Sequence, residues 1–194
     1  MGNSMSGFVL GGDTSGAITL IAAAVAGTNT ITLPAESGTV LTSATNLAAQ
    51  LPTWSILQVV QGTTSTAVTY VGTSTWVDTA VTATITLASA SSKVLVISNI
   101  NGIYNNQAAN YAYSQYRLLR GASSIAGTIG QGPGIPGTNN SIHVPSLVHV
   151  YLDSPAAGGS TTYKVQINNG GNSSSGTTLQ WNSTQSTMTL IEFK

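Results

Sequence analysis

Short runs of β-branched and aromatic residues alternate with polar residues along most of the chain. In the run 111–119, odd-numbered residues fall on one face of an extended strand and even-numbered residues on the other, which is the pattern of a half-buried β-strand. Gly, Asn, Ser and Pro separate the runs, as turn residues do. After residue 53 we predict strands at 56–61, 66–72, 83–88, 93–102, 111–121, 146–153, 161–168 and 186–194.

Eight short strands with turn signals between them predict an all-β fold built as an antiparallel β-sandwich. The chain contains no cysteine, whereas an immunoglobulin-like sandwich usually carries a cysteine pair. The number of strands and the missing cysteines therefore favour a jelly-roll-like sandwich.

The first fifth of the chain carries strand segments that are too short to bury a face alone. The tripeptide Ile-Thr-Leu occurs at 18–20 and again at 31–33, between turn residues, so residues 13–42 predict a β stem that needs neighbouring chains. Residues 43–52 predict a short helical connector that Pro52 ends. We expect residues 1–52 to be a stem for attachment and trimerisation, and residues 53–194 to be the sandwich head.

One segment of the head lacks the alternating pattern. Residues 122–145 are rich in Gly and Pro, and we predict a loop there, because most strands are joined by far fewer residues. Loops longer than about 12–15 residues are usually functional or disordered. This loop is therefore a candidate for a binding surface or for a clasp on a neighbouring chain.

Charge is scarce in this sequence. Charged residues make up 5% of the chain and the formal net charge is zero, against roughly 25% charged residues in ordinary soluble domains. The five Lys and Arg residues are scattered, which argues against a nucleic-acid partner. No apolar stretch reaches the roughly 20 residues that cross a bilayer, so we expect no membrane insertion. A neutral β-rich chain exposes aggregation-prone strand edges unless partners cover them, and we expect a homotrimer.

Residues 27–43 read GTNTITLPAESGTVLTS, and this stretch resembles the N-terminal stem segments of tailed-bacteriophage fibre and appendage proteins. The match is looser over residues 12–26, and the ending STMTLIEFK at 186–194 is similar in style to the last strand of such heads. The resemblance implies a virion location, three chains wound together along the stem, and a jelly-roll head that binds a host-surface glycan or protein. It implies no catalytic or metal-binding residue.

Chemistry-bearing side chains are few and dispersed. The acids lie on different predicted elements, and a facing pair such as Asp78 with Asp153 would be needed for glycoside hydrolysis. His143 and His149 match no compact ligand motif, although threefold symmetry would gather three copies of either around one axis. We expect no enzyme activity, no catalytic or metal site and no cofactor.

The aromatic residues give the candidate binding site. Exposed Tyr side chains flanked by Asn and Gln stack on sugar rings and bind sugar hydroxyls, whereas buried Tyr and Trp fill cores and oligomer interfaces. Both uses remain open at this point. The receptor-binding candidates are Tyr104, Tyr111, Tyr113, Gln131, Asn139 and Asn140.

The attachment candidate is the apolar patch Phe8, Val9 and Leu10 in the Gly/Ser-rich N-terminus, which would insert into another virion protein of the tail or capsid. Three functions follow from this sequence: a trimeric tail fibre or appendage, a capsid decoration or cement protein, and a secreted carbohydrate-binding module. The resemblance points to a virion part without fixing which one, and the tail fibre or appendage is our first hypothesis.

Overall fold

The computed structural model describes residues 7–11, 17–21, 51–71, 73–106, 112–131, 141–171 and 176–194, and the chain forms two compact units, 1–42 and 43–194. In the first unit, β1 (Gly7–Gly11) pairs antiparallel with β2 (Ala17–Ile21). The second unit is the head, and its described part contains no α-helix. The predicted stem boundary at residue 52 stays a prediction, and residues 43–50 of the expected helical connector lie outside the described residues.

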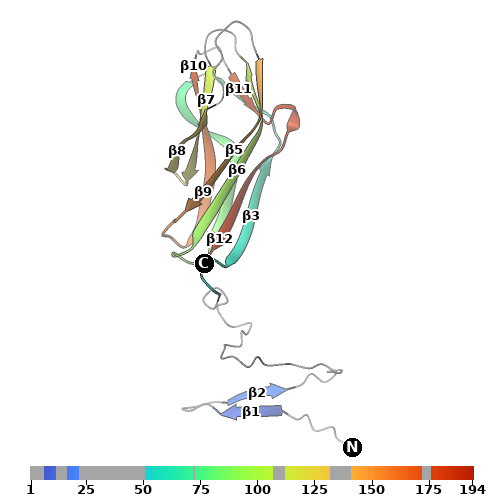
Figure 1. Cartoon of the computed structure of the whole chain (residues 1–194), viewed down its shortest axis with the longest axis vertical. Helices are drawn as coiled ribbons and strands as arrows, with labels where there is room; N and C mark the ends of the chain where they lie inside the picture. The colour runs from blue at the N-terminus through green and yellow to red at the C-terminus, as the bar shows by residue number, and fades with distance from the viewer. Residues whose placement is uncertain are drawn as a thin grey trace, which may run out of the picture. The chain divides into compact units, whose positions relative to one another are not determined.

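The head is built from long antiparallel strands (Figure 1). They are β3 (Ile56–Thr64), β4 (Val68–Val71), β5 (Thr73–Leu87), β6 (Lys93–Asn106), β7 (Ala112–Arg120), β8 (Ser123–Gln131), β9 (Ser141–Asp153), β10 (Gly159–Gly171), β11 (Gly176–Leu179) and β12 (Ser186–Phe193). A short 3-10 turn, η1 (Trp181–Ser183), separates β11 from β12. Both β11 and β12 pair with β6, so together they act as one interrupted strand, β11/β12. β4 pairs with β11 and β3 pairs with β12, so β3 and β4 act as a second interrupted strand, β3/β4.

The strand order is that of a jelly roll. One sheet has the order β3/β4, β11/β12, β6, β9, and the other has the order β5, β10, β7, β8. Numbered in chain order as eight strands, the sheets read 1-8-3-6 and 2-7-4-5, which is the arrangement of two interlocked Greek keys. The all-β, jelly-roll-like sandwich expected from the sequence is confirmed.

The core lies between the two sheets. The inward residues are the even-numbered ones of β6 up to Ile100, the odd-numbered ones of β6 from Ile103, and the odd-numbered ones of β5 from Thr79, because side chains alternate along a strand. Among the fully buried side chains are Val81, Ile85, Val94, Val96, Ile100, Val165 and Leu190. The polar face expected on the outside of each strand is present on the β5 sheet but not, as described below, on the β6 sheet.

The chain enters and leaves the head at the same end of the sandwich. The backbone N–H of Trp54 donates to the carbonyl of Lys194 at 3.1 Å, and the N–H of Lys194 donates to Ser55 at 3.0 Å. We call this the proximal end. At the opposite, distal end β6, β8 and β10 finish, and β7, β9 and β11 begin (Figure 1).

The prediction of one long loop at 122–145 was wrong. After a turn at Gly121, residues 123–131 form β8, which pairs with β7, and β9 begins already at Ser141. The pattern missed β8 because this edge strand is rich in Ser, Gly and Thr and follows β7 with several register shifts. Pro145 fits β9 because Val144 and Ser146 have partners on β6 and Pro145 has none in the ladder. Pro lacks a backbone N–H for the ladder, so it is tolerated at such a position of an edge strand.

Candidate functional site

The outer face of the β6 sheet is apolar, although it faces away from the core. One row of directly paired residues crosses all four strands from β3 to β9, and every member is aliphatic. The row consists of Val59, Ile191, Leu95 and Leu152. Four aliphatic side chains in register across a solvent-facing sheet are unusual, because antiparallel sheets normally carry polar residues on that side.

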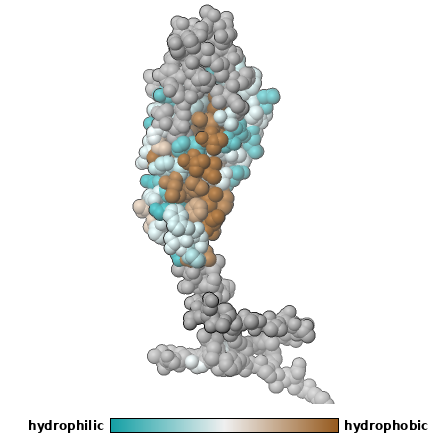
Figure 2. Space-filling model, in the orientation of Figure 1, coloured by the Kyte–Doolittle hydropathy of each residue, from teal (hydrophilic) through white to brown (hydrophobic). Residues whose placement is uncertain are grey.

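Neighbouring rows extend this apolar row into a band. Toward the proximal end lie Ile56 and Phe193, with Trp54 in edge-on contact with the Phe193 ring at 5.9 Å between centroids. Toward the distal end, Ile97 pairs with Val150, and Val148 follows on β9. Figure 2 shows hydrophobic side chains gathered in one band along the sandwich. We name the set Trp54, Ile56, Val59, Leu95, Ile97, Val148, Val150, Leu152, Ile191 and Phe193 the outer band.

The two edges of the outer band are its most exposed parts. Ile56 and Val59 on β3 are 58% and 57% exposed, and Val148 and Val150 on β9 are 56% and 57% exposed. The central residues on β6 and β12 are half-buried, because neighbours flank them on both sides. Exposed aliphatic side chains in such a contiguous set mark an interaction surface.

Sequence reasoning missed the outer band, although its signal is visible in the sequence. The segments 93–97 and 147–152 carry apolar residues at consecutive positions and not only at every second one. Consecutive apolar residues in a strand mean that both faces are apolar. The hydrophobic pattern served only to locate the strands, and the apolar character of their second face was not inferred from it.

A second aromatic feature lies nearer the distal end. The Tyr104 and Trp181 rings stack with 4.6 Å between centroids and 25° between planes. Gly102, at φ +60, allows η1 to approach β6 this closely: a Cβ there would lie 2.0 Å from Thr184 Oγ1. Trp181 is 44% exposed, so part of the stack is accessible to solvent.

A buried polar cluster joins the strand ends behind this stack. The Thr177 hydroxyl lies 2.7 Å from the side-chain oxygens of both Asn105 and Asn169, and 2.5 Å from the Ser114 hydroxyl. The Asn169 amide also donates to the Tyr70 carbonyl. These contacts link β6, β7, β10, β11 and β4 near the distal end, and buried networks of this kind hold a structure in one arrangement.

The structure places three of the six receptor-binding candidates toward one end of the head. Tyr104 lies near the end of β6, Tyr113 near the start of β7 and Gln131 at the end of β8, and all of these are distal. Tyr111, Asn139 and Asn140 lie outside the described residues. The attachment candidates Phe8, Val9 and Leu10 form the centre of β1, opposite Leu20, Thr19 and Ile18.

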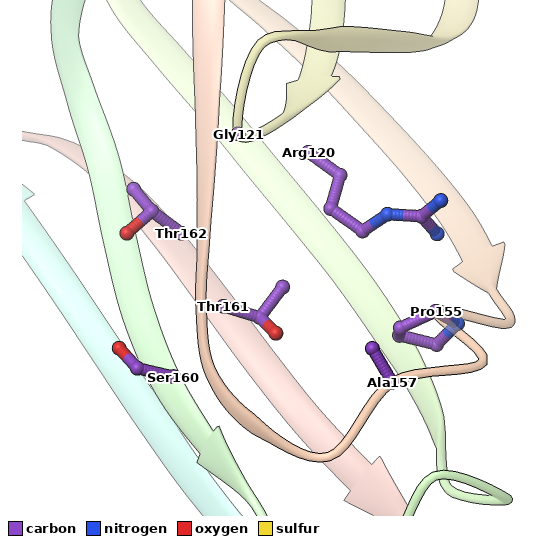
Figure 3. Close-up of a pocket in the computed structure, with 7 residues that line it drawn as sticks. All are labelled: Arg120, Gly121, Pro155, Ala157, Ser160, Thr161 and Thr162. Carbon is purple, nitrogen blue, oxygen red and sulfur yellow. The ribbon is translucent and has the colours of Figure 1, made fainter.

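A small pocket lies toward the proximal end, where β7 turns into β8 and β9 connects to β10. It has a volume of about 230 Å³ and is lined by Arg120, Gly121, Pro155, Ala157 and Ser160 to Thr162 (Figure 3). Arg120 Nη1 donates to both Asp153 oxygens at 2.8 Å. Arg120 carries the one charged group among the residues that line the pocket. Because Asp153 compensates this charge, we assign Arg120 a structural role and not a role in binding a ligand.

The acids are held apart in the head. Asp78 accepts from Lys164 and Gln166 at 2.6 Å, and these hydrogen bonds lower the pKa of its carboxyl. Asp153 is paired with Arg120, and the buried Glu192 accepts from Gln58 and from the Ala88 N–H. Among the described residues no three His, Cys, Asp or Glu side chains gather as metal ligands. No helix in the described part is long and apolar enough to cross a membrane.

Comparison with known proteins gives little to add to this geometry. No protein-family model and no curated protein sequence matches the chain. A solved structure of the infectious bursal disease virus Gx strain is similar with a TM-score of 0.33 and 11% identity, over 72% of this chain and 38% of that chain. A mutant VP2 protein of the same virus, from derived T=1 particles, has a TM-score of 0.33 and 10% identity over 80% and 40%.

The chain therefore spans about two fifths of the length of each of these neighbours. At these TM-scores the likeness carries no argument. The jelly-roll assignment rests on the strand pairing of this chain.

Proposed function

We propose that this protein is a non-enzymatic structural protein of a tailed-phage virion, a homotrimeric tail fibre or appendage that displays a host-binding head. The observation that carries the proposal is that the point of chain entry and the described receptor-binding candidates lie toward opposite ends of the head. The chain enters the jelly roll at the proximal end, so attachment through the N-terminal residues leaves the distal end free. The receptor-binding candidates of the described part flank that free end.

Three further observations support this function. The stem stretch 27–43 resembles fibre stems. Jelly rolls recur in viral structural proteins and in lectins, which is a fold-level analogy. The outer band needs a partner, and a chain with 5% charged residues has few charges to keep it soluble alone.

A capsid decoration protein is the second candidate, because the outer band would also pack against coat subunits. Imaging of the intact virion separates the two. Density for three copies of the head on the tail supports the proposal, whereas density on the capsid lattice supports the decoration role. Purified virions without this chain, measured by mass spectrometry, would contradict both.

A further inference from the structure

We propose that the outer band is the contact between copies of this chain, and that the β9 edge of one copy packs against the β3 edge of the next in a closed ring of three. The contact joins Val148, Val150 and Leu152 of one chain to Ile56 and Val59 of its neighbour. This inference rests on the proposed trimer and adds where its subunits meet.

The high exposure of the apolar side chains at the two edges indicates that a partner chain covers these edges. Val150 and Val59 are each 57% exposed, while Leu95 and Ile191 between them are half-buried by their neighbours. A partner that covered only the centre of the sheet would leave the most exposed aliphatic side chains in water. Contacts at both edges cover them.

The chemistry of the face fits a neutral partner. Lys93 carries the single charge among the outward residues in these rows of the described sheet, and its ammonium donates to Ser154 at 2.9 Å. A strongly acidic or basic partner would find no opposite charge to pair with. A second copy, with zero formal net charge and the same apolar residues, meets this face without a charge mismatch.

The two edges of the outer band allow a closed ring. The β9 and β3 edges lie on opposite sides of one sheet, so one chain can use them on two different neighbours. Contacts of this heterologous kind generate a ring when the rotation closes, whereas a twofold dimer would satisfy both edges with a single partner. The ring of three is the arrangement that agrees with the proposed trimer. With three copies, each β9 edge is covered by one neighbour and each β3 edge by the other.

The size of the face is adequate for such a contact. Strands about 4.8 Å apart make a four-stranded face roughly 19 Å wide, and the rows of the outer band cover about 20 Å along the strands. The resulting area of about 400 Å² per chain is divided between two neighbours, so it forms the apolar core of the two contacts and only part of the roughly 800 Å² per partner that a standard interface buries. Thr63, Thr187, Asn99 and Gln61 continue the face as the polar rim that interfaces carry.

Because the chain contains no cysteine, cross-linking tests the contact directly. The full-length double variant Val59→Cys, Val150→Cys is treated with a short bis-maleimide and run on a denaturing gel. We expect covalent trimers. The matched control, Thr86→Cys with Ser124→Cys, places exposed cysteines on the two edges of the other sheet and should stay uncross-linked.

The outcomes separate this inference from the proposed function. Covalent dimers from Val150→Cys alone would overturn the ring, because they show β9 against β9. A native mass of three chains without Val59-to-Val150 cross-links would overturn the interface and leave the trimer intact. A monomeric native mass would overturn both.

A charge variant gives an independent reading. Val150→Glu should raise the dissociation constant of the trimer at least tenfold, because it buries an unpaired carboxylate in the contact, while circular dichroism stays that of the β-fold. Thr86→Glu on the other sheet should leave that constant unchanged. An unchanged trimer with Val150→Glu would refute the proposed contact.

Discussion

Asp153 accepts a 2.7 Å hydrogen bond from the hydroxyl of Tyr163 in the interior of the sandwich. Arg120 adds two contacts of 2.8 Å to the same carboxylate, so β7, β9 and β10 are tied together where the two sheets meet. Burial first, and then the hydrogen bond and negative charge of Asp153, raise the pKa of Tyr163. Tyr163 therefore stays protonated and remains a donor throughout the ordinary pH range.

We expect Asp153→Asn to lower the free energy of unfolding by about 3 kcal/mol, because it leaves Arg120 without its counter-charge at a mostly buried site. The estimate is at the low end for such pairs since Arg120 is 30% exposed. Urea unfolding measures the change. Asp78→Asn is the matched control, because Asp78 pairs with Lys164 at the surface, and its loss should stay below about 1 kcal/mol. Equal losses of stability in the two variants would contradict the structural role of the mostly buried Asp153–Arg120 pair.

The strands that sequence reasoning found are those with an apolar inner face. The predicted run 161–168 lies within β10, where Tyr163, Val165 and Ile167 alternate inward. β8 and β11 were missed for the opposite reason: they are short of apolar residues and are held by pairing with their neighbours. The formation of such strands depends on pairing with other strands, which the residue pattern within one segment does not carry.

The candidate site was only partly readable from the sequence. Tyr104 was a candidate because of its neighbours, but its stacking partner Trp181 comes from a different part of the chain. Their contact depends on the left-handed backbone at Gly102 and on the interruption of β11/β12 by η1. Neither feature follows from periodicity, so three-dimensional structure was needed to place the two rings together.

His149 should make the stability of the head depend on pH. Burial lowers the pKa of His149 below its usual 6.5, so near pH 6 the unfolded chain binds more protons than the folded one. Stability is therefore complete above the unfolded pKa and falls as the pH drops through 6.5 toward the lower pKa of the folded state. The difference between the wild type and His149→Gln in urea unfolding isolates this effect, because His143 is common to both. A difference that is constant over this range would contradict the prediction.

Gly102→Ala should destabilise the head more than Gly121→Ala. Both glycines have positive φ, +60 and +57, so each substitution costs about 1–2 kcal/mol of backbone strain. At Gly102 the new Cβ would also lie 2.0 Å from Thr184 Oγ1 and 2.8 Å from the Trp181 nitrogen, whereas nothing lies within 4 Å at Gly121. Urea unfolding measures the loss of stability, and tryptophan fluorescence reports a change around Trp181. Equal losses of stability in the two variants would contradict the prediction, because η1 would then move away from the new Cβ at no cost in free energy.

Trp181→Ala should weaken host adsorption without dissociating the trimer. Trp181 stacks on Tyr104 toward the distal end, beyond the rows of the outer band, and an exposed aromatic stack is the natural platform for a sugar ring. The measurement is competition: purified full-length protein should block adsorption of the phage, and the variant should need at least a tenfold higher concentration. Thr86→Ala is the control, since Thr86 is exposed on the other sheet, outside the outer band, and lies toward the proximal end. If both variants keep a native mass of three chains and compete as well as the wild type, the distal aromatic stack is not the receptor site.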